Sequence, residues 1–124
     1  KIMAVKNNKS QSVEIEITPN RVLSFIGLAA KAGRIIAGFD SVSISIGQKT
    51  AKLVIIARDT SPGTARKIES LCIKEHVPVY RFFDKNSLGD ALGKSPKAIV
   101  AVMDENFARE IAVKMDRLIR NIPE

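Results

Sequence analysis

Two short, uninterrupted apolar runs constrain the fold of this chain more than any other feature. They are residues 53–57 (LVIIA) and residues 98–103 (AIVAVM). Continuous apolar runs of this length are typical of strands that are covered on both faces, whereas a strand with one wet face alternates apolar and polar residues. The sequence therefore predicts a sheet with helices packed on both of its sides.

Segments with helical spacing alternate with these runs. Good N-cap residues precede three of them, namely Thr18, Ser61 and Asp104. The predicted helices are residues 19–32, ended by a left-handed Gly33, a helix opened by Ser61-Pro62, residues 87–92, closed by Gly93, and a last helix after Asp104. Further strands are expected at residues 35–36 and 77–82. This order predicts an α/β fold, a three-layer α/β/α sandwich around a mixed sheet of about four strands.

Residues 38–47 give a divided signal. Gly38 begins a turn, and Asp40 is a candidate N-cap for a helix on which Val42 and Ile46 would share one face. Val42, Ile44 and Ile46 also alternate with serines, which is the spacing of a strand. Helix and strand both stay open for this segment.

The two ends of the chain differ in character. Residues 1–17 are predicted to be an N-terminal tail or an edge strand, because polar sequence precedes an alternation of apolar residues with glutamates. Residues 18–124 are predicted to form a single domain. No apolar run approaches the roughly 18 residues of a spanning helix, so no membrane partner is expected. The lone Cys72 fits a reducing compartment, and we expect a cytoplasmic location.

The charge balance favours a polyanionic partner. Lys and Arg number 20 against 13 for Asp and Glu, a formal net charge of +7. Such an excess is typical of nucleic-acid binders, although solubility alone explains it equally well. One Tyr, five Phe and no Trp leave little material for stacking on single-stranded bases, which favours a structured target.

The sequence offers little for catalysis. One histidine, His76, and one cysteine give no metal-ligand spacing, and Cys72 lies on an apolar helix face as an inert thiol would. Asp59 follows a buried strand but lacks the acidic pair that phosphotransfer with Mg²⁺ requires, so we expect it to help cap the next helix. The Ser61-to-Thr64 turn is a weak candidate for contact with an anion. We predict no enzyme activity, metal, cofactor or small-molecule substrate.

Several separated segments carry a family resemblance. They are residues 29–42 (AAKAGRIIAGFDSV), 51–57 (AKLVIIA), 77–79 (VPV), 88–94 (LGDALGK) and 98–102 (AIVAV). In this order and spacing they resemble the L-seven-Ae/L-thirty-e ribosomal protein family, most of all its small bacterial YlxQ-type paralogues, over residues 20–108.

The resemblance implies a protein that binds kink-turn RNA, in which tandem sheared G·A pairs beside a bulge bend the helix and open a groove. It implies that the Gly38 turn and the next helix enter that groove, that Lys31 and Arg34 flank it, and that the loop before the last strand packs on an extruded nucleotide. The implied RNA-binding residues are Lys31, Arg34, Gly38, Phe39, Asp40, Ser41, Lys94, Ser95, Pro96 and Lys97. The implied partner is kink-turn or ribosomal RNA, bound by a monomer.

This chain departs from the family pattern at three positions. Asp40-Ser41 stands where kink-turn binders commonly carry Asn-Glu, and Ile44 stands where a groove-reading Lys sits. Loss of one base-edge contact costs about 1 to 3 kcal/mol of discrimination. For Phe39, exposed stacking and core packing are equally open. An alternative function is a non-enzymatic interaction or accessory module for an RNA-modifying partner, with a decayed kink-turn site.

Overall fold

The computed structural model describes residues 16–121, so the predicted tail or edge strand lies almost entirely outside the described residues. The elements, in chain order, are α1 (Pro19–Lys31), β2 (Ile35–Ala37), α2 (Phe39–Gly47), β3 (Leu53–Ala57), α3 (Pro62–Lys74), β4 (Val79–Phe82), α4 (Lys85–Ala91), β5 (Ile99–Val102) and α5 (Glu105–Arg120). None of these helices is long and apolar enough to cross a membrane.

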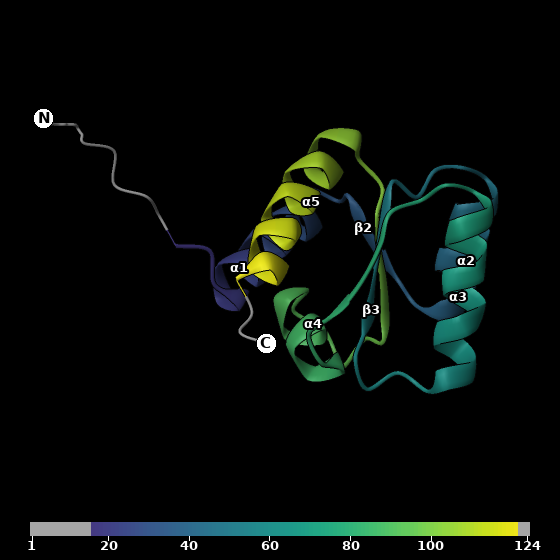
Figure 1. The fold of residues 1–124 in the computed structure, drawn as a ribbon, viewed down its shortest axis with the longest axis horizontal. Coiled ribbons are helices and arrows are strands. Elements are labelled where there is room, and N and C mark those ends of the chain that lie inside the picture. Colours follow the sequence, from purple (N-terminus) through teal and green to yellow (C-terminus); the bar gives the residue numbers. More distant parts are fainter. Residues whose placement is uncertain (1–15, 122–124) are drawn as a thin grey trace, which may run out of the picture.

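The strands form one mixed sheet of four strands in the order β2-β5-β3-β4. β5 runs antiparallel to both of its neighbours, whereas β3 and β4 are parallel. Helices α1, α4 and α5 cover one face of the sheet, and α2 and α3 cover the other (Figure 1). The predicted three-layer α/β/α sandwich around a mixed sheet is therefore confirmed.

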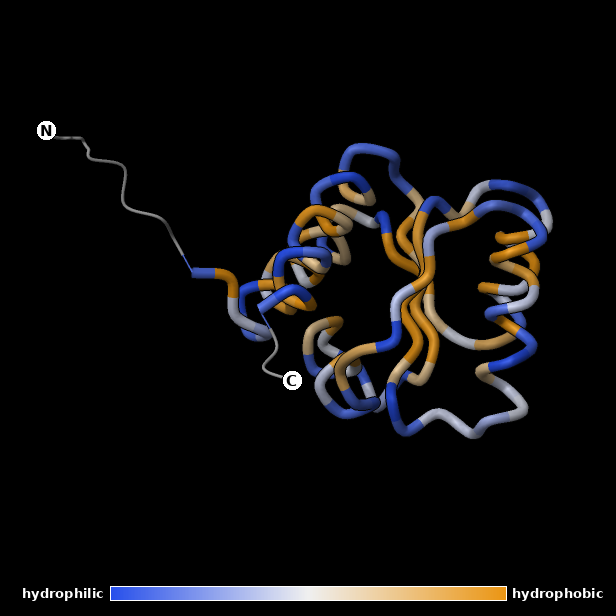
Figure 2. The backbone as a smooth tube through the Cα atoms, viewed as in Figure 1, coloured by the Kyte–Doolittle hydropathy of each residue, from blue (hydrophilic) through white to orange (hydrophobic). Residues whose placement is uncertain are grey.

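The two apolar runs lie at the centre of this sheet. In β3, Leu53 and Ile55 face the layer of α1 and α5, while Val54 and Ile56 face α2 and α3. All four side chains are fully buried, and burial of each is worth about 1.5 to 3 kcal/mol. Figure 2 shows the same arrangement as an apolar sheet between helices whose outer surfaces are polar. In a strand that is buried on both faces every position favours an apolar residue, which explains the continuous apolar runs.

Residues 39–47 form a helix, so the strand alternative is wrong. Val42 and Ile46 are fully buried against β3 and α3, and the Ser45 hydroxyl donates to the Val42 carbonyl oxygen at 2.8 Å. Because that hydrogen bond satisfies Ser45, the helix can bury this hydroxyl without leaving it unpaired. The N-cap is Gly38, not Asp40 as predicted; Asp40 lies in the first turn.

Two further aspartates hold α4 in place. The Asp84 carboxylate caps α4 by accepting from the Ser87 amide at 2.7 Å, so the helix begins two residues before the predicted Ser87. Asp59 was expected to help cap α3, which is wrong. Its carboxylate instead accepts from the Lys85 amide at 3.0 Å, and Ser61 is the N-cap of α3. Both carboxylates thus hold the first turn of α4.

Candidate nucleic-acid interface

Most of the predicted site residues gather at one end of the sheet. We call this end, formed by residues 38, 58–60, 83–85 and 97–98, the Gly38 edge. Here the Gly38 amide donates to the Ile99 carbonyl oxygen at 3.0 Å, and the Lys97 amide donates to the Lys85 carbonyl oxygen at 3.1 Å. Because β2 ends where β5 begins, the Gly38 turn and the loop before β5 lie side by side.

The Gly38 turn leaves the start of α2 open to an external acceptor. Gly38 has φ +105° and ψ 148°, a conformation that L-residues with a side chain rarely adopt. No side chain caps the helix, and Asp40 and Ser41 in its first turn are exposed. The first amide groups of α2 and the positive end of its dipole are therefore available to a phosphate or a base edge.

Phe39 directly follows Gly38 and keeps 38% of its surface exposed. It belongs to neither hydrophobic cluster of the core, and it lines a groove between α2 and α3 instead. Of the two alternatives for this residue, the structure places it on the surface.

The loop from α4 to β5 presents Lys94, Ser95 and Pro96 to solvent, and Lys97 is half-buried. The Lys94 amide donates to the Gly89 carbonyl oxygen at 2.8 Å. A Cβ atom on Gly89 would collide with the Ser95 carbonyl and lie 2.8 Å from the Pro96 Cα. Glycine is therefore required for the loop to lie flat on α4, and this close approach fixes where the loop residues face.

Lys31 and Lys94 meet across a groove of about 870 Å³ between α1 and α4. The two helices approach closely because Gly27 lies where a Cβ would come within 2.9 Å of the Ala91 carbonyl oxygen. Leu28 also lines the groove and is 56% exposed. The groove thus combines two cations with an apolar surface, a mixture that suits a nucleotide, which carries a phosphate and a flat base.

Two predicted residues, Lys31 and Arg34, do not lie at the Gly38 turn. Lys31 ends α1, three residues before Arg34, and lines the α1–α4 groove. Arg34 precedes β2, and its carbonyl oxygen accepts from the Met103 amide at 2.8 Å, at the far end of the sheet. Four residues of extended strand separate it from Gly38, about 13 Å at 3.3 Å per residue. Arg34 would reach a different part of a bound partner.

The charges of this interface are arranged for an anion. Lys31, Lys94 and Lys97 form no ion pair with any residue between 16 and 121. The acids of the Gly38 edge bind main-chain amides, and hydrogen bonds from Ser87 hold the pKa of the Asp84 carboxyl below its usual value. Two carboxylates are thus engaged within the protein, whereas Asp40 in the first turn of α2 is exposed and Asp90 lines the α1–α4 groove.

No candidate metal centre is found in the described part of the chain. Residues 16–121 hold no group of three His, Cys, Asp or Glu side chains that would bind a metal ion. Cys72 is buried, and burial, aided by Glu69, raises the pKa of its thiol to about 11. A thiol with so high a pKa stays protonated and unreactive at neutral pH.

Sequence reasoning missed Leu28 and Asp84. Leu28 lies outside the buried apolar stripe of α1, which Val22, Ile26 and Ala29 form. An apolar residue outside such a stripe is expected to be exposed, and this could have indicated Leu28 as a surface contact. Asp84 stands three residues before Ser87, whose amide it binds, which is the spacing of an N-cap.

Comparisons with known proteins agree with this geometry. A sequence profile described as the ribosomal protein L7Ae/L30e/S12e/Gadd45 family matches residues 20–112. The chain is similar to the RNA-binding protein YlxQ of Bacillus subtilis (strain 168), with 34% identity over 91 residues that cover 73% of this chain and 91% of that protein. It is also similar to the RNA-binding protein YlxQ of Enterococcus faecium, with 29% identity over 73% of this chain and 86% of that protein.

Two solved structures share the architecture. A protein of unknown function from Bacillus halodurans C superposes with a TM-score of 0.76 and 30% identity, covering 77% of this chain and 97% of that one. The 15.5kD RNA binding protein of Giardia lamblia superposes with a TM-score of 0.71 and 23% identity, covering 92% of this chain and 99% of that one. The second likeness is a likeness of fold alone.

Proposed function

The chain belongs to the ribosomal protein L7Ae/L30e/S12e/Gadd45 family, and on that premise we propose that it is a non-enzymatic protein that binds structured RNA through the Gly38 edge. The family expected from residues 29–42 and the later segments is thereby confirmed. The names of the curated relatives, both RNA-binding proteins, support RNA as the partner.

The observation that carries the proposal is the juxtaposition of the uncapped start of α2 with the Lys94-to-Lys97 loop. A regular A-form helix hides the base edges of its deep groove, so a protein that reads them needs a distorted RNA. A sharply bent, kink-turn-like RNA exposes guanine O6 and N7 atoms beside closely spaced phosphates. In the proposed complex, α2 amides meet a phosphate or base edge, and Lys31, Lys94 and Lys97 neutralise the flanking strands.

A fluorescence titration tests this proposal. The protein is titrated against a kink-turn RNA and against a duplex of matched length that lacks the tandem G·A pairs, at several salt concentrations. We expect the kinked RNA to bind at least 10-fold more tightly, with the preference retained at physiological salt, because base and shape contacts add to the salt-sensitive phosphate contacts. Equal and salt-labile binding of both RNAs would contradict the proposal.

A protein-interaction module with a decayed RNA site is the second candidate, and one observation favours it. Ile44, at the position where the family pattern has a groove-reading Lys, is 59% exposed on α2. An exposed isoleucine gains little stability for the fold and suits a protein partner. Replacement of Ile44 with Lys separates the two candidates. A gain for kinked RNA above about 150-fold, more than the 1 to 3 kcal/mol of one contact, would indicate a decayed site, whereas a smaller gain leaves a working one.

A further inference from the structure

A second basic groove lies on the opposite face of the sheet from the α1–α4 groove. It runs between α2 and α3 and measures about 820 Å³. Phe39 and Ser43 line it from α2, and α3 contributes one continuous face. That face consists of Gly63, Arg66, Lys67, Ser70, Leu71 and Lys74. The spacing of three and four residues shows that a single stripe of α3 faces the groove over its whole length.

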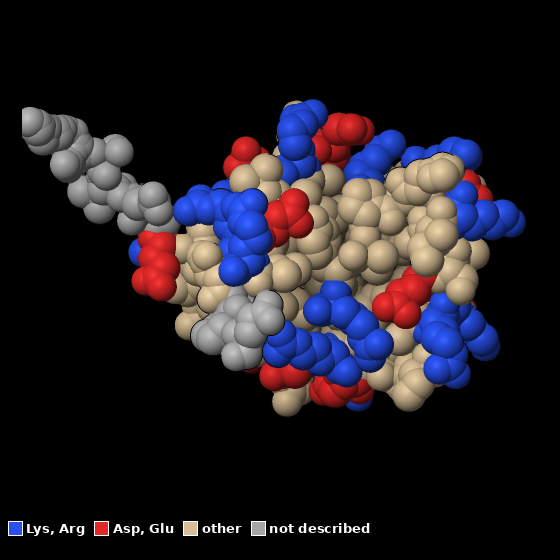
Figure 3. Space-filling view, viewed as in Figure 1, with Lys and Arg blue, Asp and Glu red and all other residues tan. Residues whose placement is uncertain are grey.

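The groove carries cations without partners. Arg66, Lys67 and Lys74 are exposed, and none of their side chains forms an ion pair or hydrogen bond with another residue in the range 16–121. No acidic residue lines the groove. Figure 3 shows Lys and Arg side chains at the end of the molecule where α2 and α3 lie, as well as over the rest of the visible face. Like charges on one helix face repel one another, so this arrangement favours an anionic ligand over an empty surface.

The floor of the groove is apolar and contains one unused polar atom. Phe39 and Leu71 are its large apolar side chains. The Ser43 hydroxyl is the buried side-chain polar atom that has no hydrogen-bond partner in the described part of the chain. A ligand acceptor at the groove would supply the partner that this hydroxyl lacks, after a small shift of the side chain.

The groove is continuous with the proposed RNA site. β2 and β3 are parallel, since both are antiparallel to the strand between them, so α2 and α3 both begin at the Gly38 edge. Phe39 belongs to the Gly38 turn and also lines the groove. An RNA strand that leaves the Gly38 turn would therefore pass over Phe39 and then along α3. Arg66 and Lys74 lie about 12 Å apart along that helix at 1.5 Å per residue, enough to follow more than one phosphate.

We propose that the groove between α2 and α3 binds a single-stranded RNA extension of the structured element held at the Gly38 edge. One base stacks on Phe39, and the phosphates that follow lie against Arg66, Lys67 and Lys74. This inference rests on the proposed function, because the Gly38 edge supplies the structured element from which the extension leaves. The sparse aromatic content of the chain fits a grip on the backbone rather than a series of stacked bases.

Three RNAs test the inference. They are a blunt kink-turn RNA and the same RNA with a six-nucleotide extension at its 5′ or at its 3′ end. We expect one of the two extensions to raise affinity about 10-fold. In the variant Arg66→Ala with Lys74→Ala, that gain is lost while affinity for the blunt RNA stays unchanged. The slope of log affinity against log salt for the extended RNA becomes shallower by about 0.7 for each phosphate contact removed.

The matched control removes one Arg and one Lys elsewhere, by Lys52→Ala with Arg109→Ala at the far end of the sheet. This control should keep the gain from the extension. If neither extension raises affinity in a protein that still prefers the kinked RNA, the inference is overturned and the proposed function stands. If kinked RNA is not preferred at all, the proposed function fails.

Binding to the groove alone is then tested with a single-stranded hexanucleotide. Backbone amide shifts confined to Phe39 and α3 would support the groove as an RNA surface, and the absence of such shifts would overturn it. An acidic helical peptide that produces those shifts while the oligonucleotide does not would also overturn the inference, in favour of a protein partner.

Discussion

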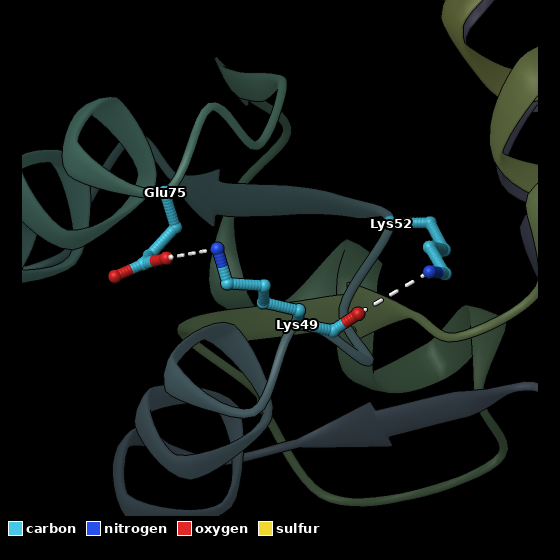
Figure 4. Close-up of polar contacts among 3 residues, drawn as sticks. All are labelled: Lys49, Lys52 and Glu75. Atoms are coloured by element: carbon cyan, nitrogen blue, oxygen red, sulfur yellow. Dashed lines mark hydrogen bonds and ion pairs between the residues drawn. The ribbon is translucent and has the colours of Figure 1, made fainter.

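The two ends of the central sheet handle charge in opposite ways. At the end formed by residues 49–52 and 75–78, which we call the Lys49 edge, two lysines and a glutamate have partners within the protein (Figure 4). Lys49 Nζ lies 3.3 Å from Glu75 Oε1, and Lys52 Nζ donates to the Lys49 carbonyl oxygen at 3.2 Å. At the Gly38 edge the carboxylates bind main-chain amides and the nearby lysines stay unpaired.

This difference between the two edges indicates more about where RNA would bind than the net charge does. Both edges carry lysines, so a count of charges over the sequence does not distinguish them. A cation that is already paired gains little from a phosphate, since it must first give up its partner, whereas an unpaired cation releases only water and counterions. We therefore expect RNA affinity to depend on the Gly38 edge and to be nearly independent of the Lys49 edge.

The largest effect on stability should come from substitution of Gly89, because the loop before β5 packs directly against it. Gly89→Ala places a Cβ against the Ser95 carbonyl and the Pro96 Cα, both of them backbone groups that cannot rotate away. We expect the free energy of unfolding to fall by about 2 to 3 kcal/mol, as for an overpacked interior. Urea denaturation measures this fall. The control is Gly47→Ala, where nothing lies within 4 Å and the helix should be unchanged or more stable. Equal stability of both variants would contradict the close packing of the loop.

The second test compares the edges directly by RNA affinity. Lys94→Ala with Lys97→Ala removes two unpaired cations from the loop that leads into the Gly38 edge. Lys52→Ala with Arg109→Ala removes two cations from the other end, where both side chains donate hydrogen bonds within the protein. We expect the first pair to weaken binding to kinked RNA about 10- to 100-fold and to lower the salt slope by about 0.9 per lost contact. The second pair should change affinity less than 3-fold. A similar loss for both pairs would mean that net charge alone governs binding.

The comparison of edges also separates what the sequence could predict from what it could not. The strands at residues 53–57 and 99–102 were predictable because burial on both faces leaves a local signature, an unbroken apolar run. The caps at Thr18 and Asp104 were predictable because capping is a contact between near neighbours. Gly33 and Gly93, at positive φ, were predictable as helix ends for the same reason.

The features that sequence reasoning missed depend on contacts between distant segments. Asp59 binds the amide of Lys85, 26 residues away, so no local pattern could assign it. Residues 39–47 show strand spacing, but packing of Val42 and Ile46 on β3 and α3 makes them a helix. Tertiary contacts overrode the local pattern there. The position of Arg34 at the far end of β2 likewise follows from the register of β2 with β5.

Substitution of Gly38 should have a smaller effect on stability, and it tests the contrast between the two edges further. Gly38→Ala leaves the space around the Cβ empty, so its cost is conformational only, about 1 to 3 kcal/mol in a region of φ and ψ that is essentially confined to glycine. We expect a modest loss of stability by urea denaturation and a larger loss of RNA affinity, because the strained turn tilts the first amides of α2. Gly47→Ala is the control, since its φ is not in the left-handed region and no neighbour is close. RNA affinity that falls equally in both variants would argue against the Gly38 turn as the contact.

The smallest expected effect is a change in the pH dependence of stability, and it concerns Asp84 at the Gly38 edge. The Asp84 carboxylate accepts a hydrogen bond from a main-chain amide of α4. Hydrogen bonds from the Ser87 amide hold the pKa of Asp84 below its usual value in the folded protein. The stabilisation is therefore complete above the unfolded pKa of about 3.9 and is lost as pH falls through the lower, folded pKa. Asp84→Asn keeps a side-chain cap but removes the charge, so it should remove this part of the pH dependence.

Urea midpoints of the wild type and of Asp84→Asn, measured from pH 6 down to pH 2, check this expectation. The wild type should be the more stable protein at pH 6, and the difference should shrink as the pH falls below about 4. Asp90→Asn is a suitable control because the Asp90 side chain caps no helix. A difference that stays constant across this pH range would show that the carboxylate is not engaged by the main chain. Asp84 would then be free to compete with RNA phosphates, and the contrast between the two edges would narrow.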